Sequence, residues 1–235
     1  MHKRIWELDA LRGICILGMV VVHVIYDLGS LGLEHNSRLF SMVQYWGGTV
    51  FVLISGICVT LGSRHVHRGL LVFGCGMICT VVTAGLFWLG LTGKGIIIYF
   101  GVLHCLGVCM LLWSLLRRFE NWFLAALGVS FCAVGLYLER VVLVSFPWLM
   151  PLGFQYPGFS SSDYFPLLPN LGYFLLGALL GRTLYREKTT RFPWSNTQNL
   201  PVRFLCWCGR QSLPIYLIHQ PLIAGLLTLA GILYR

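Results

Sequence analysis

The sequence predicts an all-α membrane protein, a polytopic bundle of about seven transmembrane helices. Of its 235 residues, 57% are hydrophobic and only 11% are charged, whereas globular domains carry about 25% charged residues. A disordered chain is excluded because low hydrophobicity is its signature, and a compact soluble domain would lack the polar residues to cover its surface. At about 20 apolar residues per crossing, this length allows about six to eight helices.

Seven apolar runs, each bounded by charged residues or by Gly and Pro, are the expected crossings. They cover residues 8–28, 39–61, 69–89, 96–116, 122–138, 165–185 and 212–233. Residues 141–164 are rich in Pro, Gly, Ser and aromatic side chains, so we expect them to lie on the outer interface of the membrane or to fold back as a cap. Residues 186–210 form a basic cytoplasmic connection, and residues 1–235 are expected to be one transmembrane domain.

The distribution of basic residues predicts a cytoplasmic N-terminus and a C-terminus outside. Of the seventeen Lys and Arg residues, twelve then face the cytoplasm, four lie outside and Arg12 lies within the first helix, which satisfies the positive-inside rule. The cytoplasmic ones are Lys3, Arg4, Arg64, Arg68, Arg117, Arg118, Arg182, Arg186, Lys188, Arg191, Arg203 and Arg210. Membrane topology therefore accounts for most of the net charge of +9, and no nucleic-acid partner is expected.

The nine cysteines predict neither a disulfide framework nor a metal site. Seven fall inside apolar runs, where a free thiol behaves as a small hydrophobic side chain. Cys206 and Cys208 flank Trp207 with no second pair of ligands nearby, short of the four that a structural zinc site requires. We therefore expect no metal cofactor.

Four ionisable residues share one face of the first helix: Asp9, Arg12, His23 and Asp27. Arg12 and His23 are eleven positions apart, which at ~100° per residue returns the chain to within about 20° of the same direction. Such groups inside a membrane are costly and usually functional. The open alternatives are an ion pair of Asp9 with Arg12 at the cytoplasmic interface and a solvated Asp27 at the outer one. We expect His23 to act as a general base oriented by Asp27, one turn away.

Two later runs also carry polar groups at membrane depth. His104 lies at roughly the depth of His23, and either assists catalysis or makes a helix-to-helix hydrogen bond. His219 and Gln220 precede Pro221, which frees a backbone carbonyl one turn earlier, so their polarity is either structural or lines a cavity. His35, in the short outer loop, is a secondary catalytic candidate.

Several segments resemble a known family. LDALRG at residues 8–13, GMVVVHVIYDL at 18–28, FGVLHCLG at 100–107, DYFPLLP at 163–169 and GRQSLPIYLIHQP at 209–221 are similar to motifs of the heparan-α-glucosaminide N-acetyltransferase-like family, within the wider transmembrane acyltransferase group. The resemblance implies transfer of an acetyl group from cytoplasmic acetyl-CoA to an amine or hydroxyl of an extracytoplasmic carbohydrate. Lysosomal members resemble this sequence less at one point, since another residue stands where His23 does, and the resemblance offers His35 as a candidate counterpart of their proposed catalytic histidine.

On this reading, acetyl-CoA is the co-substrate and binds from the cytoplasm to Arg12, Asp9, Arg182, Arg210, His219 and Gln220. The other partners implied are a glycan or amino-sugar acceptor and the lipid bilayer of a bacterial cytoplasmic membrane. Small residues at 172–181 serve internal packing or a homodimer interface. Direct transfer and an acetyl-histidine intermediate both stay open. The competing class is a transporter or flippase that uses the Asp/Arg/His ladder as a proton relay.

Overall fold

The computed structural model describes residues 5–29, 38–141, 146–192 and 199–230. Within these residues the protein is helical, as predicted, and its one isolated β-bridge joins Phe100 to Tyr164. The elements are α1 (Trp6–Gly29), α2 (Arg38–Leu61), α3 (His65–Trp88), η1 (Lys94–Ile96), α4 (Val102–Leu116), α5 (Asn121–Val141), η2 (Pro147–Leu152), α6 (Leu167–Leu184), α7 (Leu200–Arg210) and α8 (Ser212–Leu229), where η marks a 3-10 helix.

Five of these helices are long and apolar enough to cross a membrane: α1, α3, α5, α6 and α8. Shorter apolar helices, Trp46–Leu61 in α2 and Val102–Leu116 in α4, occupy the other two predicted crossings. The protein is therefore a multi-pass membrane protein by the length and apolarity of its helices. The exact number of crossings and their orientation stay predictions.

The structure differs most from the sequence expectation at two places. Helix α4 begins at Val102 rather than at residue 96, because the preceding residues form η1 and an extended segment whose backbone is held by side chains; for example, the amide of Ile98 donates to Thr83 Oγ1 at 3.1 Å. Helix α7 lies inside the predicted basic connection. Pro201 in its first turn was a usable signal, since a proline there loses no intrahelical hydrogen bond.

The chain separates into two compact units, and α2 runs from the first into the second. Unit 1 comprises Met1–Ile54 and Glu187–Arg235, and unit 2 comprises Ser55–Arg186. Unit 1 contains α1, α7 and α8, whereas unit 2 contains α3 to α6. The candidate residues are accordingly divided between two separate packing environments.

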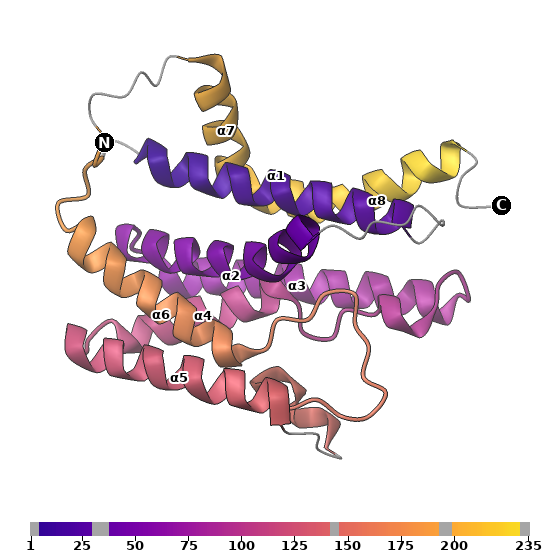
Figure 1. Cartoon of the computed structure of the whole chain (residues 1–235), viewed down its shortest axis with the longest axis horizontal. Helices are drawn as coiled ribbons and strands as arrows, with labels where there is room; N and C mark the ends of the chain where they lie inside the picture. Colours follow the sequence, from indigo (N-terminus) through magenta and orange to yellow (C-terminus); the bar gives the residue numbers. More distant parts are fainter. Residues whose placement is uncertain (1–4, 30–37, 142–145, 193–198, 231–235) are drawn as a thin grey trace. The chain divides into compact units, whose positions relative to one another are not determined.

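In unit 1, α7 stands across α1 and α8 runs beside α1 in the same direction (Figure 1). Two glycines allow the close crossing of α1 and α7. A Cβ atom added at Gly13 would overlap the carbonyl oxygen of Leu205, and one added at Gly209 would overlap the carbonyl oxygen of Asp9. Small residues at such crossings let helix backbones approach closely, which is how α7 docks without a long apolar surface.

The beginning of α1 is tied to the segment that follows α6. Both carboxylate oxygens of the buried Glu7 accept hydrogen bonds, from the Thr190 hydroxyl at 2.7 Å and from the Arg191 amide at 2.8 Å. Beside them, Trp6 Nε1 donates to the carbonyl of Phe192 at 3.4 Å. A buried carboxylate requires such partners, and here they pin residues 190–192 to the first turn of α1.

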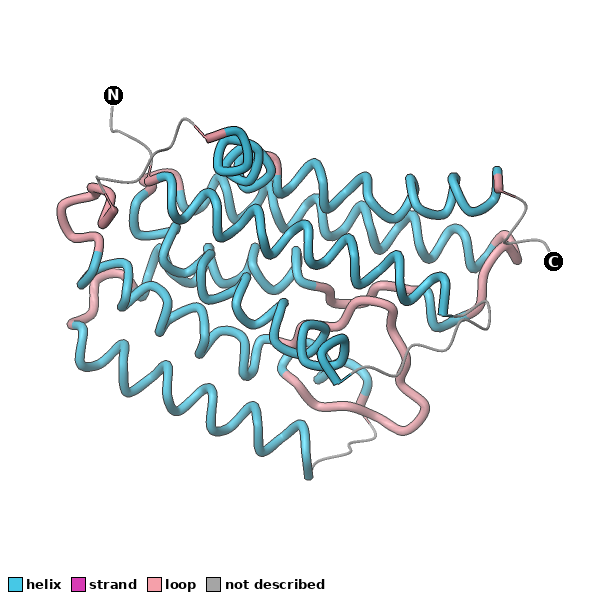
Figure 2. Tube along the Cα trace, turned by 45° about the horizontal axis from the view of Figure 1, so that its top comes forward, coloured by secondary structure: helices cyan, strands magenta, loops and turns pink. Residues whose placement is uncertain are grey.

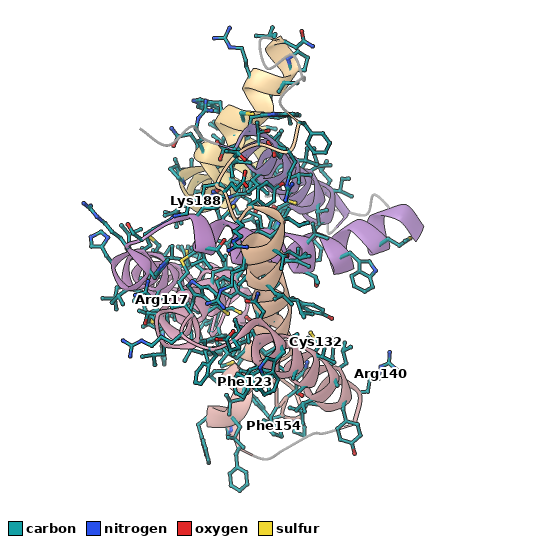
Figure 3. All side chains as sticks on the ribbon, turned by 90° about the vertical axis from the view of Figure 1, so that its left-hand side faces the viewer. Arg117, Phe123, Cys132, Arg140, Phe154 and Lys188 are labelled. Carbon is teal, nitrogen blue, oxygen red and sulfur yellow. The ribbon has the colours of Figure 1, made fainter. Side chains whose placement is uncertain are left out.

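In unit 2, α3 packs against α4, and α5 lies beside α6 (Figure 2). Cys132 of α5 faces α6, with its Sγ atom 4.0 Å from the carbonyl oxygen of Pro169 (Figure 3). A Cβ atom at Gly172 would lie 2.6 Å from that sulfur, and one at Gly181 would lie 2.8 Å from the carbonyl oxygen of Ile57. The predicted small residues of 172–181 therefore serve internal packing.

The segment after α5 folds back onto the loop before α4, one of the two outcomes expected. Ser161 Oγ and Ser162 Oγ donate to the carbonyls of Ile97 and Ile96 at 2.9 and 2.7 Å. Asp163 Oδ2 accepts the amide of Val102 at 3.0 Å, so this distant carboxylate satisfies a donor at the first turn of α4.

Candidate functional site

The candidate site of unit 1 is the seam between α1 and α8. Three residue pairs meet along it: Arg12 with Ser212, His23 with His219, and Asp27 with Gln220. The residue numbers rise together on both helices, so the helices are parallel. The predicted topology, in which the first and last of seven crossings point the same way, also requires parallel helices here, and it stays a prediction.

At one end of the seam, Arg12 Nη2 donates to Ser212 Oγ at 2.6 Å. Ser212 is 3% exposed, and Arg12 Nε is buried with no hydrogen-bond partner among the described residues. A buried N–H donor without a partner is costly and marks a place where a ligand acceptor would be stabilised. Sequence reasoning did not name Ser212, although it lies two residues after the predicted Arg210 and inside the motif at residues 209–221.

In the middle of the seam, two histidines have the same tautomer. His23 Nδ1 lies 2.8 Å from the carbonyl oxygen of Met19, and His219 Nδ1 lies 2.6 Å from that of Tyr216. A carbonyl only accepts, so each Nδ1 carries the proton and each neutral ring keeps a lone pair on Nε2. The rings touch edge to face with centroids 4.8 Å apart. In this tautomer, both imidazoles present Nε2 as a hydrogen-bond acceptor.

His219 is the more enclosed of the two histidines. It is 8% exposed, and its Nε2 atom is buried with no hydrogen-bond partner among the described residues. The next residue is similar, because Gln220 Nε2 donates to Asp27 Oδ2 at 3.3 Å while Gln220 Oε1 is buried and unpartnered. This half of the seam thus presents unsatisfied acceptors, whereas the Arg12 end presents an unsatisfied donor.

The hydrogen bond that orients His23 through its Nδ1 atom comes from its own helix, four residues back. The sequence prediction named Asp27 for this task, and the carboxylate of Asp27 accepts from Gln220 of α8. The i−4 carbonyl was not considered from the sequence, although a histidine inside any helix has one nearby. Asp27 as the orienting group stays a prediction.

His104, in unit 2, has the opposite tautomer. The amide of Gly101 donates to its Nδ1 atom at 3.1 Å, so the proton resides on Nε2, which lies 3.3 Å from Thr80 Oγ1. That hydroxyl in turn donates to the carbonyl of Ile98 at 2.7 Å. With 2% exposure and both nitrogens engaged, His104 joins α3, α4 and the intervening loop. This geometry matches the helix-to-helix alternative left open by the sequence.

Arg182, also in unit 2, is surrounded by acceptors. Its guanidinium donates to the carbonyl oxygens of Arg117 and Phe119 and to Asn121 Oδ1, the latter two at 2.8 and 3.2 Å. It also lies 4.9 Å above the centroid of the Trp113 ring. These contacts hold the turn between α4 and α5, where the C-terminal carbonyls of α4 attract a cation.

The other predicted site residues are Asp9, Arg210 and His35. Asp9 is half-buried on α1, with its backbone carbonyl against Gly209, and Arg210 is exposed at the end of α7. His35 lies outside the described residues. Among the residues that the structure does describe, no group of three or more His, Cys, Asp or Glu side chains gathers as a metal site would require.

Comparison with protein-family models matches residues 4–221 to the family described as heparan-alpha-glucosaminide N-acetyltransferase, catalytic. Searches of curated proteins and of solved structures found no match. The family match runs from the start of α1 to Gln220 and Pro221 in α8, so it includes every residue of the seam. The resemblance inferred from the sequence is confirmed, and this chain belongs to the heparan-α-glucosaminide N-acetyltransferase catalytic family, a family of membrane acetyltransferases.

Proposed function

We propose that this protein transfers the acetyl group of cytoplasmic acetyl-CoA to an amine or hydroxyl of an extracytoplasmic carbohydrate, with His23 as the general base. The observation that carries the proposal is the polarity of the α1–α8 seam. Hydrogen-bond acceptors on His23, His219 and Gln220 lie in one half of it, and the Arg12 hydrogen-bond donor lies at the other end. An acceptor substrate bearing N–H or O–H groups fits the half with His23, His219 and Gln220, and the carbonyl groups of acetyl-CoA fit the end with Arg12.

In the proposed reaction, the nitrogen or oxygen of the acceptor attacks the thioester carbonyl carbon. A carbon–nitrogen or carbon–oxygen bond forms, and the acceptor proton moves to His23 Nε2. The tetrahedral oxyanion then collapses, the carbon–sulfur bond breaks, and the CoA thiolate takes the proton back from His23. General-base assistance of this kind contributes about 10²- to 10⁴-fold to the rate.

His219 and Gln220 have a positioning role in this proposal. Their buried acceptor atoms, Nε2 and Oε1, receive further donor groups of a hydroxyl-rich or amino acceptor and hold its nucleophile toward His23. Leaving such buried acceptors unpaired costs about 1–3 kcal/mol each, so a ligand that satisfies them is preferred over one that does not.

We propose that Arg12 binds the acetyl donor, acetyl-CoA. Its Nε–H has no hydrogen-bond partner among the described residues while Nη2 is bound to Ser212, so the guanidinium is held in place with its buried Nε–H still able to donate. A carbonyl of the pantetheine arm is a suitable acceptor for it. We propose that the CoA phosphates bind exposed basic residues between α6 and α7, such as Lys188 and Arg191, because the Arg182 donors are already directed at three backbone and side-chain acceptors.

The rival readings make different predictions. Membership of an acetyltransferase family does not favour a transporter that uses the ladder as a proton relay. An acetyl-histidine intermediate is still compatible with the seam, since an Nε2 lone pair is a nucleophile as well as a base. Incubation of the protein with radiolabelled acetyl-CoA in the absence of acceptor separates the two routes, because only the covalent one labels the protein.

The proposal is tested in inside-out vesicles loaded with glucosamine and supplied with radiolabelled acetyl-CoA. We expect His23→Ala to lower transfer by about 10²-fold or more, the loss expected for a general base, and His219→Ala to raise the acceptor KM. His67→Ala, at an exposed position of α3, is the matched control and should retain full activity. Full turnover in His23→Ala would remove His23 from the mechanism, and wild-type vesicles without labelled product would contradict the acceptor class.

A further inference from the structure

Helix α7 has two faces of different character. Its buried face, formed by Cys206, Cys208 and Gly209, packs on α1, where Cys206 Sγ donates to the carbonyl of Trp6 at 3.4 Å. Its other face, here called the α7 outer face, is formed by Arg203, Phe204, Trp207 and Arg210, all of them exposed. Arg203 and Arg210 are seven residues apart, so they point within about 20° of each other around the helix.

The location of α7 restricts what can cover this face. Helix α7 crosses α1 near residues 9–13, at the beginning of a helix long enough to span a membrane, and it stands across that helix (Figure 1). A single residue, Gln211, separates it from α8, which is also long enough to span. A helix set across the ends of two spans lies in the plane of the membrane surface.

The side chains of the α7 outer face suit a phospholipid headgroup layer. The Phe204 and Trp207 rings are each 50% exposed and stack with centroids 6.4 Å apart, and aromatic residues of this kind concentrate at membrane interfaces. The two guanidiniums on the same side provide charge complementary to lipid phosphates. Neither a purely apolar partner surface nor bulk water satisfies both types of side chain.

We propose that the α7 outer face binds the phosphates of anionic phospholipids in the leaflet at this end of the protein. The two arginines contact the phosphates, and the aromatic pair inserts at the glycerol level. Because α7 continues into α8 after one residue, this contact also sets the depth of Ser212 and of the seam residues that follow it. Anionic lipid thereby becomes a structural ligand of unit 1, independent of any acetyl transfer.

The test compares protein in nanodiscs of phosphatidylcholine alone with nanodiscs that also contain phosphatidylglycerol. We expect phosphatidylglycerol to raise the thermal unfolding midpoint of the wild-type protein, and the double variant Arg203→Gln/Arg210→Gln to lose at least half of that rise. Arg140→Gln is the control, since Arg140 is an exposed arginine in the last turn of the spanning helix α5 and projects away from it (Figure 3). An unchanged rise in the double variant, or an equal loss in the control, would overturn the proposal.

Two further measurements separate the possible sources of phosphate and give a readout that does not depend on stability. Adenosine 3′,5′-bisphosphate, which carries CoA phosphates without the acetyl group, should not reproduce the effect of phosphatidylglycerol; if it does, the α7 outer face is a nucleotide site instead. The fluorescence of Trp207 is obtained as the difference between the wild type and Trp207→Phe, and brominated phosphatidylglycerol should quench that difference. No quenching of that difference would place α7 away from the lipid and refute the proposal even where every variant folds.

Discussion

The crossing of α1 and α7 can be tested by adding one methyl group. A Cβ atom at Gly13 would lie 2.8 Å from the carbonyl carbon of Leu205, and an ordinary contact begins at 3.4 Å, so the two helices must separate by at least 0.6 Å. The obstacle is backbone, which cannot rotate aside. Overpacking of this kind costs about 1–3 kcal/mol, which at about 2–4 °C per kcal/mol lowers the unfolding midpoint of Gly13→Ala by about 2–12 °C.

Gly18→Ala is the matched control, because it lies in the same helix and an added Cβ atom there has nothing within 4 Å. Alanine is favoured over glycine in a helix interior by about 0.5–1 kcal/mol, so this variant should be neutral or slightly stabilised. Both proteins are measured by thermal unfolding in the same detergent. A Gly13→Ala protein as stable as Gly18→Ala would show that α7 does not pack on α1 at this crossing.

Three further predictions follow from contacts in the loops and in α7. Asp163→Ala removes the acceptor of the Val102 amide and should cost about 1 kcal/mol, read as a lower unfolding midpoint; an unchanged midpoint would contradict the contact. Arg182→Ala should lower stability and leave the KM for acetyl-CoA unchanged, whereas a raised KM with normal stability would return Arg182 to the cofactor site. Burial, followed by the charge of Asp9, raises the pKa of the Cys206 thiol, so its alkylation should be slow at pH 8 and accelerate only above the pH at which free cysteine reacts; rapid labelling at pH 8, located by peptide mass spectrometry, would refute this.

Much of the helical framework could be predicted because hydrocarbon length imposes a strong pattern on sequence. Each predicted crossing contains a helix, and α1 agrees with its predicted run to within two residues. Helix α7 was missed because it is stabilised by packing on α1 at Gly13 and Gly209, and such a tertiary contact is not visible in the sequence. Gly209 also lowers the helix propensity of this segment, because glycine is a poor helix former. The late start of α4 has a similar cause, since its preceding loop is held by hydrogen bonds to Thr83 and Ser161.

The candidate site was partly accessible from the sequence. Helical arithmetic places Arg12, His23 and Asp27 on one face, and all three contact α8 in the structure. Which α8 residues they meet depends on the register of two parallel helices separated by most of the chain, and nothing local encodes that register. Sequence reasoning therefore grouped His219 with the cofactor site, whereas its ring lies against that of His23.

The histidines also differ in what they can do chemically, and their hydrogen-bond partners decide it. His23 and His219 face backbone carbonyls at Nδ1, which forces the proton onto that atom and leaves Nε2 basic. His104 has a backbone amide at Nδ1, so its proton is on Nε2. That atom lies beside the Thr80 hydroxyl, which itself donates to the carbonyl of Ile98. Depth in the membrane is similar for His23 and His104 in the sequence prediction, so depth cannot separate them. The type of backbone group beside Nδ1 does separate them, and it supports the proposal that the proton acceptor lies in the α1–α8 seam.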